Sequence, residues 1–244
     1  MPRFFVKPED FNDNTVNILG NDAFHIARAL RMAVGDEITV ADTVGYEYSC
    51  ILRKIRDDIC TCEIIDKAPA KTESPVDITL FMGYPKGDKL EFIIQKAVEL
   101  GANKIVPFES SRCVKRPRAD KAEKQGARLS RIAEEAAKQC GRARLSEVCA
   151  PIDFSSMLTE AKKSELALFC YEGEETFSLK ETLIKNPHAK SISVVVGCEG
   201  GFSKDEALAA RESGLIPINL GPRILRCETA PIYALSSISY NYEL

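Results

Sequence analysis

The chain has 244 residues, of which 45% are hydrophobic and 28% are charged, with 33 Lys and Arg against 36 Asp and Glu. This composition excludes a disordered chain, and no stretch comes near the roughly 20 apolar residues that a membrane-spanning helix needs. The N-terminus also lacks the pattern of a signal peptide. We therefore expect a soluble, cytoplasmic protein that does not act in a membrane.

The formal net charge of −3 is unevenly distributed along the chain. Residues 112–144 contain 11 Lys and Arg but 4 Asp and Glu, a net charge of +7, so the remaining residues carry −10. A basic block of this kind is typical of a nucleic-acid-binding surface. A solvated helix face would have the same composition, so charge alone leaves both interpretations open.

The chain contains nine cysteines but no Cys-x-x-Cys pair, and His25 and His188 are its two histidines. An odd number of cysteines without a secretory signal argues against a disulfide framework. The two histidines leave little material for a zinc site. We expect reduced thiols and no metal.

The first 68 residues have the pattern of short strands, at 37–40, 46–55 and 59–65, with one helix near 22–30. Several short strands and one helix in so short a segment indicate a small β-barrel. Two prolines among small polar residues make 68–75 the best candidate for a linker. The resulting domain boundaries are 1–70 and 74–244.

From residue 77 onward, strands and helices alternate. We expect strands at 78–82, 104–108, 166–170, 191–196 and 217–220, and helices at 90–100, 119–139, 204–213 and from 229 to the C-terminus. This alternation predicts an α/β domain in which helices cover both faces of a mostly parallel sheet.

Two glycine-containing loops follow expected strands. The first, Gly197-Cys198-Glu199-Gly200-Gly201-Phe202-Ser203, leads into a capping box formed by Ser203 and Glu206. The second, Leu220-Gly221-Pro222-Arg223-Ile224-Leu225-Arg226-Cys227-Glu228, is too apolar for an ordinary surface turn. Glycines at the carboxyl ends of parallel strands let a ligand approach the backbone, so the two loops together predict a ligand crevice.

Other nucleotide-binding and hydrolase motifs are absent from the sequence. The segment Gly83-Tyr84-Pro85-Lys86-Gly87-Asp88-Lys89 lacks the spacing and the hydroxyl of a phosphate loop. No G-x-G-x-x-G follows a strand, and there is no G-x-S-x-G elbow. The ligand is therefore expected to be neither a triphosphate nor a dinucleotide bound in the Rossmann manner.

The two loops closely resemble the signature loops of the bacterial RsmE family, which are SPOUT-class methyltransferases. The resemblance spans nearly the whole chain, because five further segments also match, two of them in the N-terminal domain. The matching segments are Lys86-Gly87-Asp88-Lys89, residues 94–101, residues 132–139, Pro2-Arg3-Phe4-Phe5 and residues 25–31. This chain has Cys198 where the family usually has proline, and Cys227 where it usually has threonine.

The resemblance implies a PUA-like β-barrel followed by a SPOUT domain with a C-terminal trefoil knot. It implies methylation of uridine N3 in 16S rRNA of the small ribosomal subunit, at the family's uracil 1498, with S-adenosyl-L-methionine as the methyl donor. It also implies a homodimer. Two alternatives stay open: a tRNA methyltransferase of the same class, and a non-catalytic RNA-binding module.

By the same resemblance, the cofactor would be held by residues of both loops, namely Gly197, Glu199, Gly200, Gly201, Leu220, Gly221, Ile224, Leu225 and Arg226. Methylation at N3 requires loss of the imide proton from a base held out of its stack. We expect Arg226 to stabilise negative charge on the uracil oxygens and Glu199 or Glu228 to accept the proton. Equally open alternatives are a helix cap for Glu228 and a turn-stabilising role for Glu199.

Contact with RNA is expected from two sets of basic residues. The first set lies in the barrel domain and the second opens the basic block; they are Arg3, His25, Arg28 and Arg31, and Arg112, Lys115, Arg116 and Arg118. Each of these side chains could instead be a solvated surface charge, and His25 could be a packed residue.

Overall fold

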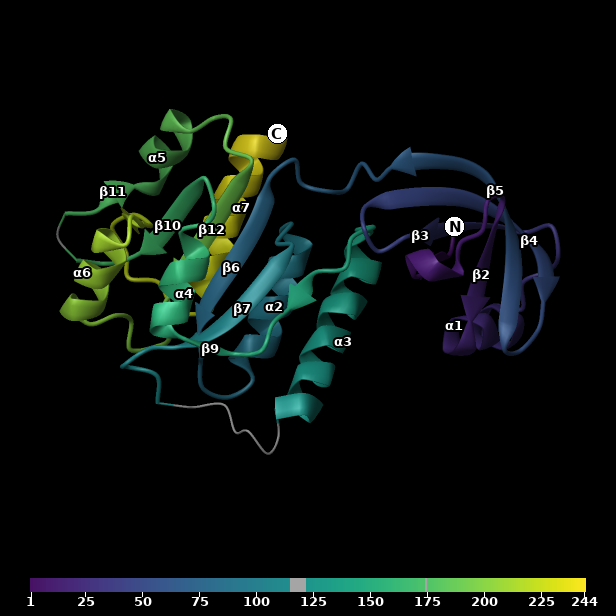
Figure 1. Ribbon diagram of the computed structural model, residues 1–244, viewed down its shortest axis with the longest axis horizontal. Coiled ribbons are helices and arrows are strands. Elements are labelled where there is room, and N and C mark those ends of the chain that lie inside the picture. The colour runs from purple at the N-terminus through teal and green to yellow at the C-terminus, as the bar shows by residue number, and fades with distance from the viewer. Residues whose placement is uncertain (115–121, 174) are drawn as a thin grey trace. The chain divides into compact units, whose positions relative to one another are not determined.

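The protein is described by a computed structural model that covers residues 1–114, 122–173 and 175–244. The chain divides into two compact units (Figure 1). The first unit consists of residues 1–73 and 137–145, and the second consists of residues 74–136 and 146–244.

The first unit is built on a curled five-stranded sheet in the order β1-β3-β4-β5-β2, in which β1 lies parallel to β3 and the other neighbours are antiparallel. Alternate residues of these strands point inward, so side chains such as Ile18, Ile38 and Leu52 form a fully buried core. The strands are β1 (Arg3–Phe5), β2 (Thr15–Leu19), β3 (Glu37–Ala41), β4 (Tyr46–Ile55) and β5 (Ile59–Pro69). A 3₁₀ turn (Pro8–Asp10), α1 (Gly20–Phe24) and a π-helical segment (His25–Ala29) complete the unit.

The segment 137–145 belongs to the first unit, although the sequence analysis placed it in the second domain. Arg3 donates a hydrogen bond to the backbone carbonyl of Arg142 at 3.1 Å. The Arg142 guanidinium in turn pairs with Glu73 at 2.8 Å, with 3% of the arginine side chain exposed. Such bonds, to a backbone carbonyl and between buried charged side chains, produce no periodic pattern in the sequence. The sequence therefore could not predict that segment 137–145 belongs to the first unit.

The expected strands at 37–40, 46–55 and 59–65 are confirmed, but β5 continues to Pro69 and takes up the start of the expected linker. The expected helix near 22–30 is an α-helical turn that continues as a π-helix. Strands β1 and β2 were not predicted.

The second unit contains a parallel sheet in the order β11-β13-β10-β12-β6-β7-β8, with β9 also paired to β7. Its long central strands are nearly continuous apolar runs, as expected where both faces are buried. The strands are β6 (Asp77–Gly83), β7 (Lys104–Glu109), β8 (Glu147–Val148), β9 (Ile152–Asp153), β10 (Leu166–Cys170), β11 (Phe177–Ser178), β12 (Ser191–Val196) and β13 (Ile216–Asn219).

Helices cover both faces of this sheet (Figure 1). α4 contacts β6, β7 and β12 over one face, where Phe81, Phe108 and Phe169 form part of the core. α7 contacts β12 and packs against α2 and α5 on the other. The helices are α2 (Lys89–Glu99), α3 (Ala122–Cys140), α4 (Phe154–Ala161), α5 (Leu179–Lys185), α6 (Lys204–Glu212) and α7 (Thr229–Glu243).

The expected parallel α/β architecture is thus confirmed, and each of the five expected strands is present. The expected helix at 119–139 corresponds to α3, whose first expected residues lie outside the described ranges. The short elements β8, β9, β11, α4 and α5 were not predicted. No helix within the described ranges is long and apolar enough to cross a membrane.

Candidate functional site

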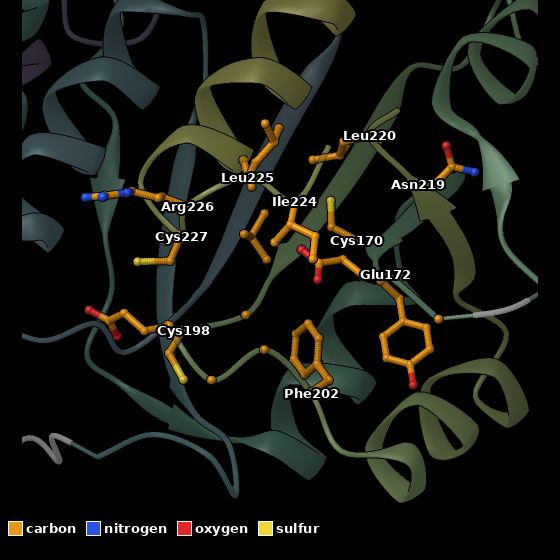
Figure 2. A pocket seen from close by; sticks show the side chains of 18 of the residues that line it. Cys170, Glu172, Cys198, Phe202, Asn219, Leu220, Ile224, Leu225, Arg226 and Cys227 are labelled. Carbon is orange, nitrogen blue, oxygen red and sulfur yellow. The ribbon is translucent and has the colours of Figure 1, made fainter. Parts of the chain in front are cut away.

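Three neighbouring strands of the second unit end at the same edge of the sheet. β10 lies between β12 and β13 and runs parallel to both, so the loops that follow the three strands emerge side by side. These loops line one cavity of about 830 Å³ (Figure 2). A crevice outside the carboxyl ends of parallel strands is the usual position of a ligand site in an open α/β sheet.

All the residues that the sequence analysis assigned to cofactor binding line this cavity. They are Gly197, Glu199, Gly200 and Gly201 from the loop after β12, and Leu220, Gly221, Ile224, Leu225 and Arg226 from the loop after β13. The cavity has a third wall that the sequence analysis did not predict, made by residues 170–173 after β10. A strand was already expected at 166–170, so a loop at the same edge of the sheet could have been inferred. That loop has a single glycine in place of the glycine pattern that marks the other two.

Glycines set the path of the loop after β12. A Cβ atom at Gly200 would lie 2.8 Å from the Cβ of Arg112, which is closer than real Cβ atoms come. Arg112 also donates a hydrogen bond from Nη1 to the carbonyl of Gly200 at 3.0 Å. At Gly201 (φ +60°) and Gly221 (φ +102°) an added Cβ would meet no protein atom within 4 Å. The loops are therefore packed tightly on one side and leave their backbone open on the other.

The predicted capping box is confirmed. The backbone N–H of Glu206 donates to Ser203 Oγ at 3.1 Å, and that of Ser203 donates to Glu206 Oε2 at 2.9 Å. Glu206 Oε1 also accepts a bond from the N–H of Ser111 at 2.7 Å. The start of α6 is thereby tied to the turn that carries Arg112.

Lys89, at the start of α2, connects the two glycine loops. Its Nζ lies 3.1 Å from Glu199 Oε1 and 3.2 Å from Glu228 Oε2. The Glu199 carboxylate also accepts a bond from the N–H of Lys86 at 3.1 Å. Lys89 lies in the segment that the sequence analysis noted for its resemblance but gave no role.

These contacts set the protonation states of the cluster. Bonds to Glu199 and then to Glu228 raise the pKa of Lys89. Burial raises the pKa of Glu199, but bonds from backbone amides and from Lys89 outweigh burial and lower it. The pKa of Glu228 is lowered chiefly by its own backbone N–H, with help from the Cys227 thiol and Lys89. Both carboxylates are ionised near neutral pH, and a lowered pKa makes each a weaker proton acceptor.

The three residues predicted for catalysis occupy different positions. Glu199 and Arg226 line the cavity, whereas Glu228 is not among its lining residues; it directly precedes α7 and makes no side-chain capping bond to the helix. The exposed Arg226 side chain makes no hydrogen bond or ion pair with any other described residue. Figure 2 shows it extending away from Ile224.

The two cysteines that depart from the family pattern are both buried. Cys198 donates a hydrogen bond from Sγ to the carbonyl of Arg112 at 3.3 Å, a tie that restrains the loop where proline usually stands. Cys227 Sγ donates to Glu228 at 3.2 Å. Burial raises the pKa of Cys227 to about 12, so this thiol stays neutral.

The residues predicted to contact RNA are divided between the two units. In the first unit, Arg3 forms an ion pair with Glu47 at 2.7 Å, and Arg28 forms a bidentate ion pair with Asp57. Arg31 is exposed. His25 is exposed as well and touches Phe4 edge-on, so it is not a packed core residue.

In the second unit, Arg112 lies at the cavity. Lys115, Arg116 and Arg118 lie outside the described residues. Within the described ranges, no group of three or more His, Cys, Asp or Glu side chains is arranged to hold a metal ion.

Comparison with known proteins gives matches over the whole chain. A family profile described as an RNA methyltransferase domain matches residues 72–239, and one described as an RNA methyltransferase PUA domain matches residues 18–65. The ribosomal RNA small subunit methyltransferase E of Bacillus subtilis is 36% identical, covering 100% of this chain and 98% of its own length. Its namesake from Synechocystis is 32% identical, covering 97% of this chain and 77% of its own length.

A solved structure shares the fold. It is a ribosomal RNA small subunit methyltransferase E from Neisseria gonorrhoeae bound to S-adenosyl methionine, with a TM-score of 0.84 and 31% identity, covering 98% of this chain and 97% of its own.

Proposed function

This chain belongs to the ribosomal RNA small subunit methyltransferase E family of RNA methyltransferases, and on that premise we propose that it methylates N3 of a uridine in 16S rRNA with S-adenosylmethionine as methyl donor. The observation that carries the proposal is the convergence of both glycine loops on one cavity. The bound Neisseria structure supports the same cofactor here.

The residues present fit this cofactor. A volume of about 830 Å³ lies within the range of small-molecule sites. Leu220, Ile224 and Leu225 offer apolar surface and backbone amides to a purine, and the open backbone at Gly201 and Gly221 allows close approach. The carboxylate of Glu172 offers hydrogen-bond acceptors to polar groups of the cofactor. When bound, S-adenosylmethionine supplies an electrophilic methyl group.

The protein's own part in the reaction is to hold the flipped base and stabilise its deprotonated form. Arg226 carries a guanidinium without a partner among the described residues, which suits it to stabilise charge on the uracil oxygens. Glu199 is ionised at the cavity wall and can accept the imide proton directly or through water. Glu228 does not line the cavity, so we propose it as the second candidate for the base.

The knot and the dimer belong to the same proposal. A C-terminal trefoil knot is supported by the strand order, in which β12 and β13 flank the earlier β10. A crystal structure whose chain from β13 to α7 passes outside the preceding loops would refute it. A homodimer is supported by exposed Tyr233 and Tyr240 on α7. Light scattering should give twice the chain mass of 27.0 kDa.

We assign rRNA binding to the N-terminal domain, for which the sequence predicts the bounds 1–70, with further contacts from the domain at 74–244, to which we assign methyl transfer. His25, Arg31 and Arg112 are exposed, and Arg3 and Arg28 are already paired, which favours the former three. A further phosphate-contacting stretch is proposed at Lys115, Arg116 and Arg118. Charge reversal at Arg116 and Arg118 should weaken RNA binding and its salt dependence. An rRNA substrate supports a cytoplasmic location.

The proposal is tested by supplying the purified protein with methyl-labelled S-adenosylmethionine and either small ribosomal subunits or tRNA. Label should appear as N3-methyluridine in 16S rRNA and not in tRNA. Label in tRNA alone would instead establish a tRNA methyltransferase. Failure to bind the cofactor in calorimetry would establish a non-catalytic RNA-binding module.

A further inference from the structure

Glu172 stands in the loop after β10, which forms the third wall of the cavity. Figure 2 shows its carboxylate directed into the cavity beside Ile224 and Cys170. Within the described ranges, this carboxylate makes no hydrogen bond or ion pair. Among the residues that the structure describes, none therefore requires an acidic side chain at this position.

The charges around the cavity set Glu172 apart. The lining side chains include five bases, Lys89, Arg112, Lys204, Arg223 and Arg226, but two acids, Glu172 and Glu199. Glu199 is occupied by Lys89 and by the backbone of Lys86. Of the acids that line the cavity, Glu172 is thus the one that has free acceptor oxygens among the described residues.

Asn219 and Cys170 are polar side chains that line the cavity with Glu172, and neither offers a second charged acceptor to a ligand. The Asn219 amide donates to Thr176 and to the Phe177 carbonyl, and its oxygen accepts the N–H of Gly221. Burial raises the pKa of Cys170 to about 12, so its thiol is neutral. An ionised carboxylate can only accept hydrogen bonds, so its ligand must present donors.

We propose that Glu172 binds the ribose of S-adenosylmethionine through the 2′ and 3′ hydroxyls, an assignment that rests on the proposed function. Its two oxygens suit two adjacent hydroxyl donors. The carboxylate lies beside Ile224, in the apolar loop proposed for the purine, and on the side away from Arg226, where the uracil is proposed to lie (Figure 2). Because the ribose is bonded directly to the purine, it is the group that falls next to Glu172. An acidic residue on ribose hydroxyls also recurs in dinucleotide-binding sheets.

Calorimetry on the full chain tests this assignment with two ligands. S-adenosylmethionine contains the adenine, the ribose and the amino acid, whereas 5′-methylthioadenosine lacks the amino acid. Glu172→Ala should weaken binding of both by about ten- to a hundredfold, because it removes hydrogen bonds to a charged group. Glu172→Gln, which keeps the volume and one acceptor, should fall between Glu172→Ala and wild type.

The control is Glu212→Ala, which removes an exposed, unpaired glutamate of α6 outside the cavity. It should leave both affinities unchanged, and all three variants should unfold at the wild-type temperature. Unchanged binding by Glu172→Ala would overturn the assignment. So would a loss confined to S-adenosylmethionine, which would place Glu172 on the amino acid instead. If the wild-type protein binds no S-adenosylmethionine, the proposed function fails, and the assignment fails with it.

Discussion

Gly83, the last residue of β6, lies against the loop after β12, although Gly83 itself does not line the cavity. A Cβ atom at this position would lie 2.5 Å from the backbone N of Cys198 and 2.9 Å from the carbonyl carbon of Gly197. Ordinary contact begins at 3.4 Å, so a methyl group at Gly83 pushes the loop back by about 0.9 Å, the difference between 3.4 and 2.5 Å. The obstacle is backbone, which cannot rotate away as a flexible side chain can.

Gly83→Ala should therefore damage the site more than the fold. Overpacking of this kind costs about 1–3 kcal/mol of unfolding free energy, which lowers the melting temperature by several degrees. A displacement of about 1 Å at a reacting centre can cost about a hundredfold in rate. We expect weaker cofactor binding in calorimetry and about a hundredfold lower kcat/KM in a methyl-transfer assay.

The matched control is Gly126→Ala within α3, where an added Cβ meets no atom within 4 Å. It should raise stability by up to about 1 kcal/mol, because alanine favours the helix, and leave activity unchanged. If Gly83→Ala retained wild-type affinity and turnover, the close approach of Gly197 and Cys198 to β6 would not be what shapes the cavity.

Three further predictions concern charged residues. Arg226→Ala should lower turnover by about 10²–10³-fold with cofactor affinity nearly intact, since it keeps the backbone. Arg211→Ala, on α6 and outside the cavity lining, is the control, and a wild-type rate for Arg226→Ala would exclude Arg226 from the chemistry. Lys89→Met should move the acid limb of the pH–rate profile to higher pH, because Lys89 lowers the pKa of Glu199 and Glu228. The control is Lys96→Met, whose lysine pairs with Glu99 on the same helix, and it should leave the limb in place. An acid limb that Lys89→Met does not move would exclude both carboxylates as the base. Burial raises the pKa of Glu73, but bonds from Arg142 outweigh burial, so the pKa lies below its ordinary value of 4.5. The ionised Glu73 therefore stabilises the fold at neutral pH, and this contribution should be lost as the pH falls below about 4.5. Glu73→Gln should cost about 3 kcal/mol at neutral pH in thermal unfolding and flatten that acid dependence.

Much of the second unit could be predicted because its long strands and helices have recognisable local sequence patterns. Val194, Val195 and Val196 form a buried run that stops at Gly197, and Ser203 and Glu206 mark the next helix start. α4 escaped prediction because it is 8 residues long and opens on Asp153, whose side chain accepts the N–H of Ser156. That cap was visible in the sequence, but no long apolar repeat followed it.

The candidate site was predictable to the extent that glycine marks it. The loops at Gly197 and Gly221 were found because two glycine loops follow expected parallel strands, where glycine lets a ligand approach the backbone. Lys89, Glu172 and Gly83 were missed because their roles depend on which strands are neighbours, which the sequence does not state. The same holds for the contacts that the Arg3 guanidinium makes with Glu47 and with the backbone of segment 137–145, while the role of Arg3 in RNA binding stays a prediction.

The proposed methyl transfer is tested most directly by mass spectrometry of 16S rRNA from cells that lack this protein, compared with the same cells carrying the wild-type chain or its Arg226→Ala variant. We expect N3-methyluridine to disappear from one position of 16S rRNA, to return with the wild-type chain, and to return poorly with the variant. A 16S rRNA that keeps its N3-methyluridine in the absence of the protein would contradict the proposed methyl transfer.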